Sequence, residues 1–283
     1  MKLIGKTLNY ITRSTESTGM WSEKIVCNIL RIPFNSKRKY LTDSNYPLEL
    51  RKDIEQFEPY IKKLNISEHL GNKNEYYDFK TTDGSTVSLK TNISGGKVCP
   101  QNIGQTSLVK FNEKTSLDLQ TITEYKSMIL SDTTEMINLY LVNLFCCEHL
   151  LSFKFDQGKF FHFQKIGNVS LNDPVVFRSS KDLTTWKNSN SLSINFEGDT
   201  KPLCEFQIHG SRNCIQCRFN LDTIVLLVKN KMIKNVTLKT FDLTHKYNIK
   251  VSKVQFDEIE SKQTESKQTE EFNVHSNKKR KLN

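Results

Sequence analysis

Residues 77–91 read YDFKTTDGSTVSLKT, and the expected fold follows from this stretch. Two extended runs, Tyr76–Thr81 and Thr86–Thr91, contain residues that favour strands. Between them stands Asp83-Gly84, which is typical of a two-residue hairpin turn because aspartate and glycine tolerate the positive φ that both turn positions need. The stretch therefore predicts a β-hairpin.

The open end of this hairpin should gather polar side chains. Folding at the turn brings Asp78 and Lys90 to neighbouring strands. Because side chains alternate between the faces of a strand, Ser88 and Lys90 should share one face, while Val87 and Leu89 point to the core. Carboxylate oxygens are the hard ligands that Mg²⁺ prefers. A lysine beside the metal can position or deprotonate a water and offset charge in the transition state. The hairpin therefore predicts a magnesium site.

This arrangement resembles the PD-(D/E)xK nuclease superfamily, particularly type II restriction endonucleases. Asp78 matches the aspartate on one strand of the family's hairpin, and Ser88-Leu89-Lys90 takes the place of its acid-x-Lys pair. The resemblance implies an α/β restriction-endonuclease-like core, with a mixed central sheet flanked by helices and a β-rich C-terminal half. It also implies Mg²⁺-dependent cleavage of DNA to 5′-phosphate and 3′-hydroxyl ends. Ser88 departs from the pattern, because the family normally has glutamate or aspartate there.

Glu23 is the first candidate for the missing carboxylate. It ends a Gly-x-x-x-Glu motif that begins at Gly19, and many family members carry such a motif near the metal. The resemblance then assigns Asp78 and Glu23 as metal ligands, Ser88 as a group that helps to hold the metal or a bound water, and Lys90 as the residue that orients the attacking water. Glu113 is a second candidate. The alternative is that Asp78 and Lys90 are ordinary solvated hairpin residues.

The loop after the hairpin is rich in glycine and amide residues. Lys97 and backbone N–H groups could contact DNA phosphates, with Gln101 or Gln105 near the metal or the bases. The alternative is an ordinary connection punctuated by glycine.

Residues 203–220 predict a two-stranded ribbon with one polar face. Phe206, Ile208, Ile215 and Cys217 alternate with side chains that carry amide, imidazole and guanidinium groups. Such groups suit readout of the major groove, where arginine pairs with guanine and glutamine or asparagine with adenine. The candidate DNA-binding residues of this face and its turn are Gln207, His209, Arg212, Asn213, Gln216 and Arg218. The alternative is the solvent face of an antiparallel sheet.

A zinc site at Cys214 and Cys217 is disfavoured, because positions three apart on a strand face opposite sides and no second cysteine or histidine pair completes four ligands.

The rest of the chain predicts helices followed by strands. A helix is expected over Gly19–Leu30, ended by Pro33, and a second helical region over residues 47–70. Residues 95–116 read as loop. Two helices should follow, the second beginning with Asp132 and Glu135 as a capping pair. Met136–Leu151, which contains Cys146-Cys147 and Glu148-His149, reads as a buried helix. The expected strands are Phe160–Ile166, Ser191–Phe196, Cys204–His209, Cys214–Phe219 and Val225–Lys229.

The chain of 283 residues carries a formal net charge of +10, which favours a polyanionic partner. Double-stranded DNA is the expected partner, with a homodimer required for palindromic cutting and no membrane association. The scattered cysteines and the lack of a secretion-signal pattern indicate an intracellular protein of the cytoplasm or nucleoid. The basic run Lys278–Lys281 resembles a nuclear-import signal, which would place it in a nucleus.

We expect a catalytic core over residues 1–152, a β-rich DNA-recognition part of the same domain over 153–258, and a disordered basic tail over 259–283. The function predicted from these features is a sequence-specific, Mg²⁺-dependent endonuclease of double-stranded DNA. The alternatives are a DNA-binding protein without activity, and a repair or homing nuclease with the same core.

Overall fold

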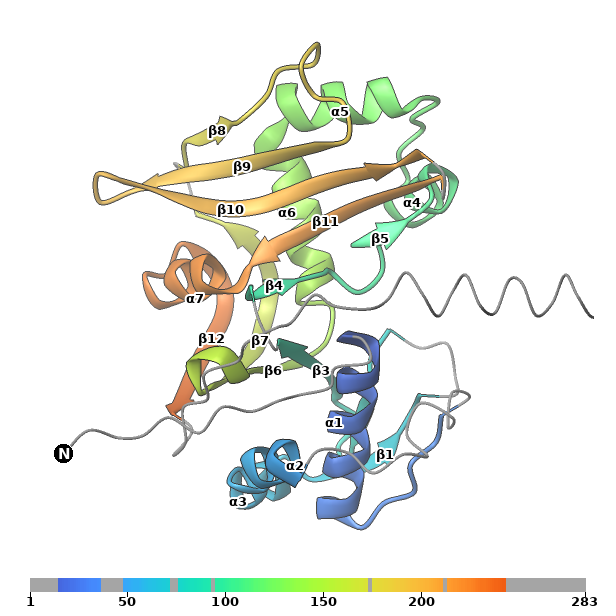
Figure 1. Ribbon diagram of the computed structural model, residues 1–283, viewed down its shortest axis with the longest axis vertical. Helices are drawn as coiled ribbons and strands as arrows, with labels where there is room; N and C mark the ends of the chain where they lie inside the picture. The colour runs from blue at the N-terminus through green and yellow to red at the C-terminus, as the bar shows by residue number, and fades with distance from the viewer. Residues whose placement is uncertain are drawn as a thin grey trace, which may run out of the picture. The chain divides into compact units, whose positions relative to one another are not determined.

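A computed structural model describes residues 15–36, 48–71, 76–92, 95–172, 175–210 and 213–242 (Figure 1). These residues belong to one compact unit, Met1–Ile249. The expected tail and Arg212 lie outside the described residues. No helix in the described ranges is long and apolar enough to cross a membrane.

The first sheet is mixed and has six strands in the order β1-β2-β3-β6-β7-β12. β3 and β6 run parallel, and the other neighbours run antiparallel. The strands span Ile66–His69, Phe79–Thr81, Thr86–Asn92, His149–Lys154, Lys159–Leu171 and Ile233–Asp242. The expected α/β class with a mixed sheet and flanking helices is confirmed at this level.

The second sheet is antiparallel and has the order β4-β11-β10-β9-β8, with β5 also paired to β11. Figure 1 shows β9, β10 and β11 as three long neighbouring strands. The strands β4, β5, β8, β9, β10 and β11 span Lys97–Val98, Gln105–Thr106, Phe177–Ser179, Ser189–Phe196, Asp199–His209 and Cys214–Asn220.

Both faces of the first sheet are buried. Alternate residues of β6 belong to different core clusters: Leu150 lies in the cluster that includes the second sheet, and Leu151 in the cluster that includes α1. Helices α1 (Thr15–Leu30), α2 (Leu48–Glu55) and α3 (Glu58–Lys63) contribute to the second of these clusters.

Helix α6 (Thr133–Leu144) connects the two sheets. The ring centroid of Tyr140 lies 5.6 Å from that of Phe206 in β10, and Phe145, just after the helix, lies 5.6 Å from Phe163 in β7. The sheets therefore share one core.

The predicted helix over Gly19–Leu30 is confirmed within α1, and the predicted strands in β7, β9, β10 and β11 are confirmed. Five other expectations about helices and strands are wrong. Val225–Lys229 is helical, because Asn220 caps α7 (Leu221–Lys229) by accepting a hydrogen bond from the backbone N–H of Thr223. Its apolar residues then follow a helical period into the core.

Residues 95–116, expected as loop, contain strands β4 and β5 and helix α4. Ser107 caps helix α4 (Leu108–Thr115) through the N–H of Lys110. Residues 66–69 of the second helical region instead form β1, because Asn65, at φ 51°, ends the helical segment.

The helix predicted up to Leu151 ends at Leu144, so Cys146-Cys147 lies after it and His149 begins β6. The capping pair at Asp132 is also wrong, because its side chain makes no cap hydrogen bond and instead accepts one from Ser131 Oγ. Helix α5 (Ile122–Ser131) has the side-chain cap that was missed, at Thr121.

Candidate active site

The predicted hairpin forms, with β2 and β3 antiparallel and Phe79 opposite Val87. Its turn differs from the two-residue form. Only Gly84, at φ 90°, has a positive φ, and the N–H of Thr81 donates to Ser85 O. Asp83 accepts from the N–H of Ser85 at 3.0 Å, so the aspartate closes the turn with its side chain.

Asp78 lies just before β2 and is held by β3. Its N–H donates to Val87 O at 2.9 Å. Its Oδ2 accepts from Ser88 Oγ at 3.1 Å and from the N–H of Leu89 at 2.6 Å. The carboxylate is therefore fixed against the strand that carries Lys90.

Lys90 is held by the loop between β4 and β5. Its Nζ donates to Gln101 Oε1 at 2.8 Å, and Gln101 Nε2 donates to Ser88 Oγ. Ser88 is 1% exposed, and its hydroxyl donates to Asp78 and accepts from Gln101. The three predicted hairpin residues and Gln101 thus form one hydrogen-bonded chain.

Glu23 lies in the same region. Helix α1 packs on β3, where a Cβ at Gly19 would meet Thr91 Oγ1 at 3.7 Å. Glu23 follows Gly19 by about one helical turn, on the same face. Burial raises the pKa of Glu23, the charge of Asp78 raises it further, and a hydrogen bond from His69 and the charge of Lys90 lower it. The carboxyl group of Glu23 is therefore within the electrostatic influence of Asp78 and Lys90, and its direct hydrogen-bond partner is His69. Glu113, the other candidate carboxylate, is exposed on α4.

His69 in β1 is a site residue that sequence reasoning missed. It is 1% exposed, and its ring stacks on Phe34 with centroids 4.8 Å apart. Its Nδ1 accepts from the N–H of Asn35 at 2.9 Å, and its Nε2 lies 3.0 Å from Glu23 Oε2. Because Nδ1 is an acceptor, a neutral ring carries its proton on Nε2 and donates it to Glu23. No local motif marks His69, since its partners lie 34 and 46 positions away.

This donor set fits a hard divalent cation. Among the described residues, no group of three or more histidine, cysteine, aspartate or glutamate side chains could hold a metal ion. Mg²⁺ needs fewer, because it binds through one or two carboxylates and keeps several waters. Asp78 and Glu23 provide two carboxylates, with the Ser88 hydroxyl bound to the first.

The predicted polar ribbon is formed by β10 and β11. Their register pairs Glu205 with Arg218 and Gln207 with Gln216, which places these four side chains on one face. On the opposite face Phe206 pairs with Cys217, and both are fully buried. His209 lies on the polar face beside Gln216, with Nε2 3.4 Å from Gln216 Oε1. Asn213 is exposed at the turn.

Glu205 connects the cations of this face. It accepts from Lys97 Nζ at 2.5 Å, Arg218 at 2.8 Å and Gln207 Nε2 at 2.9 Å. Burial by itself would raise the pKa of Glu205, but the hydrogen bonds from these three residues outweigh it and lower the pKa to about 2. Glu205 is therefore charged at neutral pH and holds Lys97 and Arg218 in place.

The segment from Lys97 to Gln105 joins the ribbon to the hairpin. Lys97 and Gln105 pair with β11, and Gln216 Nε2 donates to Gln105 Oε1 at 3.1 Å. Gln101, between them, contacts Lys90 and Ser88. The turn over residues 101–103, between β4 and β5, must be followed by a glycine at position 104, because a Cβ there would lie 2.2 Å from Pro100 O. The polar face and the hairpin cluster are thus linked by nine residues of chain.

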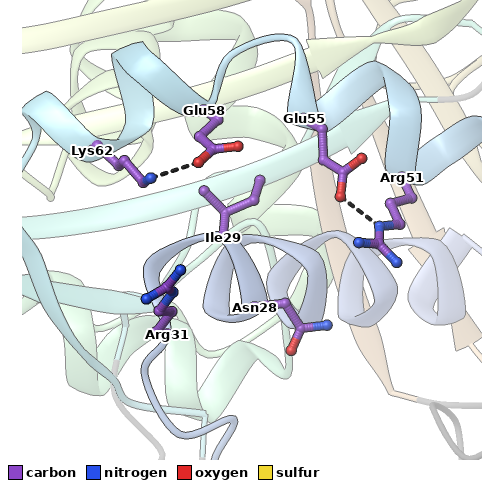
Figure 2. A pocket seen from close by; sticks show the side chains of 7 residues that line it. All are labelled: Asn28, Ile29, Arg31, Arg51, Glu55, Glu58 and Lys62. Carbon is purple, nitrogen blue, oxygen red and sulfur yellow. Dashed lines mark hydrogen bonds and ion pairs between the residues drawn. The ribbon is translucent and has the colours of Figure 1, made fainter.

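A pocket beside α1 is separate from this cluster (Figure 2). Asn28, Ile29 and Arg31 line it from α1 and the residue after it. The opposite wall carries two ion pairs at 2.5 Å, Arg51–Glu55 and Lys62–Glu58. None of Asp78, Ser88, Lys90 and Glu23 lines it.

Comparison with known proteins found a restriction enzyme. The chain is similar to the type II restriction enzyme CviAII of Paramecium bursaria Chlorella virus 1, with 27% identity over 226 residues. The match covers 75% of this chain and 60% of that enzyme, so the chain spans less than two thirds of its relative. No family model and no solved structure matches. The similarity supports a restriction-endonuclease-like relationship for this chain.

Proposed function

We propose that the chain is a Mg²⁺-dependent endonuclease of double-stranded DNA, with a PD-(D/E)xK type of centre. The observation that carries the proposal is the hydrogen-bonded cluster of Asp78, Ser88, Gln101 and Lys90, with Glu23 under the electrostatic influence of Asp78 and Lys90, in a chain similar to a restriction enzyme.

Asp78 and Glu23 would hold the metal, with Ser88 Oγ beside Asp78. Bound Mg²⁺ would polarise the scissile phosphate and lower the pKa of a water. His69 orients the Glu23 carboxylate by donating from Nε2. Leu89 N–H and Ser88 Oγ orient Asp78 in the same way.

Lys90 would orient the attacking water and offset the charge that develops on the phosphate. Gln101 Oε1 holds the ammonium group beside Ser88, so Lys90 is positioned before DNA arrives. A fixed donor costs no reorganisation at the moment of reaction.

DNA would lie across the polar face of β10 and β11. The net charge of +10 favours binding to phosphates, and Lys97 would contact the backbone. Gln207, His209, Gln216 and Arg218, with Asn213 at the turn, would read bases in the major groove, and Arg212, which precedes Asn213 in the sequence, would do the same. A palindromic target would need two copies of the chain related by a twofold axis.

The test is incubation of the purified full chain with DNA of mixed sequence and Mg²⁺. We expect discrete fragments with 5′-phosphate ends, abolished by EDTA. Binding without cleavage under Mg²⁺, Mn²⁺ and Ca²⁺ would contradict the nuclease and indicate a DNA-binding protein. Cleavage confined to mismatched or branched DNA would indicate a repair nuclease.

A further inference from the structure

Two adjacent thiols lie beside the candidate centre. Cys146 and Cys147 stand between α6 and β6, with Sγ atoms 3.8 Å apart. Cys146 is half-buried, which leaves it open to reagents, whereas Cys147 is 2% exposed. The described cysteines are free thiols.

The surroundings favour the thiolate of Cys146. The Cys147 thiol lowers the pKa of Cys146 by hydrogen bonding, burial opposes this, and the positive charges of Lys90 and Lys165 lower it further. Lys165 Nζ also donates to Cys146 O at 3.1 Å, which keeps that charge in place. A thiol with a lowered pKa and partial exposure is the more reactive kind.

We propose that Cys146 and Cys147 form a dithiol site that binds thiophilic trivalent arsenicals, with one arsenic atom bridging the two sulfurs. Two sulfurs 3.8 Å apart can both lie at about 2.3 Å from one central atom, a usual metal–thiolate length, at an S–centre–S angle of about 110°. The spacing therefore suits a bridging atom.

A direct disulfide suits the pair less well. Adjacent residues joined by a trans peptide have Cα atoms about 3.8 Å apart, and disulfides usually join Cα atoms about 4.4–6.8 Å apart. A soft cation that needs four protein ligands also fits poorly, because no group of three or more suitable side chains occurs among the described residues. A trivalent arsenical needs only the two thiols.

The reaction with an organic arsenoxide balances without an oxidant. Two arsenic–sulfur bonds form and the arsenic–oxygen bond breaks. The two thiol protons leave with that oxygen as water, and arsenic stays trivalent.

Occupation of the site should disturb the hairpin. Cys147 Sγ lies 3.8 Å from Tyr76 O, two residues before Asp78. The next residue, Glu148, accepts from the N–H and Oγ1 of Thr86, two residues before Ser88. Cys147 and Glu148 thus contact the chain just before β2 and the first residue of β3, and an adduct on Cys147 removes the first of these contacts. The expected effect of the adduct on the hairpin and on DNA cleavage rests on the proposed function.

The test uses phenylarsine oxide and intact-mass measurement of the full chain. We expect one adduct that survives a monothiol wash and is removed by a dithiol. Cys146→Ser and Cys147→Ser should each abolish this wash-resistant adduct. Binding then becomes monodentate, and the apparent affinity for phenylarsine oxide falls by about 10²-fold or more. A thermal melt shows whether the buried Cys147→Ser variant remains folded, and Cys146→Ser provides the same test at a more exposed position.

The matched control is Cys99→Ser combined with Cys214→Ser, which removes the two other half-buried thiols. This variant should keep the adduct. An adduct that survives Cys146→Ser, or that the control variant loses, would overturn the site. For the link to the hairpin, the adduct should abolish DNA cleavage by the wild-type chain, and cleavage by the adduct at the unmodified rate would overturn that link. Because the mass measurement needs no activity, failure of the dithiol site is distinguishable from failure of the nuclease proposal.

Discussion

The two carboxylates of the candidate centre come from different elements, and each has its own support. Asp78 is held by β3 through Ser88 and Leu89, whereas Glu23 depends on His69. The Glu23 side chain is 18% exposed, so keeping its charge beside Asp78 needs a compensating donor. His69 provides that donor.

We therefore expect His69→Phe to reduce Mg²⁺ affinity and DNA cleavage by about tenfold to 100-fold, the usual effect of losing a residue that orients a ligand. His69→Gln should restore much of both, because its amide can still donate to Glu23. The measurements are calorimetric Mg²⁺ titration and cleavage rates, with a thermal melt of each variant as a control for folding. Equal losses in the phenylalanine and glutamine variants would show that His69 serves only in packing.

Those helices and strands whose signals lie within a few residues of one another are predicted from the sequence. The hairpin follows from Asp83-Gly84 and from alternation along β3, and both signals lie within a few residues. The partners of Ser88 follow less directly, because Gln101 reaches it from a loop 13 positions later. Helix α7 was missed because a run rich in leucine, isoleucine and valine fits either a buried strand or a buried helix, and the cap at Asn220 decides between them. Strand β1 depends on pairing with β2, which no local pattern encodes.

The β10–β11 ribbon gives a second prediction. Gln207→Ala should lower discrimination between target and altered DNA sequences by about 1–3 kcal/mol if it contacts a base in a bidentate manner. Binding to a panel of sequences at fixed salt measures this. Asn195→Ala, in the neighbouring strand β9, is the matched control and should leave discrimination unchanged. If Gln207→Ala weakens all sequences equally, the ribbon is a phosphate clamp.

Helices α5 and α6 are joined by a buried pair of hydroxyl groups. Tyr125 and Tyr140 are both fully buried, with their oxygens 2.6 Å apart. Tyr140→Phe should lower the free energy of unfolding by about 1–3 kcal/mol, because it leaves the buried Tyr125 hydroxyl without its hydrogen-bond partner. The double variant Tyr125→Phe, Tyr140→Phe should lose little more than the single variant. Urea denaturation measures the coupling, with the exposed Tyr76→Phe as control. If the losses of the two single variants add in the double variant, the two hydroxyl groups do not stabilise each other.

For the whole molecule, the two sheets form one unit because α6 and a shared core join them. The chain from Lys97 to Gln105 adds a polar link between the ribbon and the hairpin. The sequence predicted both ends of this link separately, but it could not predict their meeting, since that depends on the pairing of β4 and β5 with β11.

Stability should fall in weak acid. Burial lowers the pKa of His162 to about 4, and the charges of His149 and Lys239 act in the same direction. An unfolded histidine titrates near pH 6.5, so between about pH 6.5 and 4 the unfolded chain binds more protons. The free energy of unfolding should therefore decrease through this window, by about 2–3 kcal/mol from this group. Urea denaturation at pH 7, 6 and 5 measures it, and His162→Gln should flatten the dependence. An unchanged slope in that variant would assign the loss to other groups.

The most direct test of the nuclease is the cleavage rate of the wild-type chain beside two lysine variants of one hairpin. Lys90→Ala should lower the Mg²⁺-dependent rate by about 10²–10³-fold, as expected for loss of a fixed donor at a developing charge. Lys80→Ala, an exposed lysine on β2, should leave it within about twofold, since that side chain is solvated. Both variants should melt at the wild-type temperature. Equal rates for wild type and Lys90→Ala, or equal loss in both variants, would contradict the assignment of this hairpin as the catalytic centre.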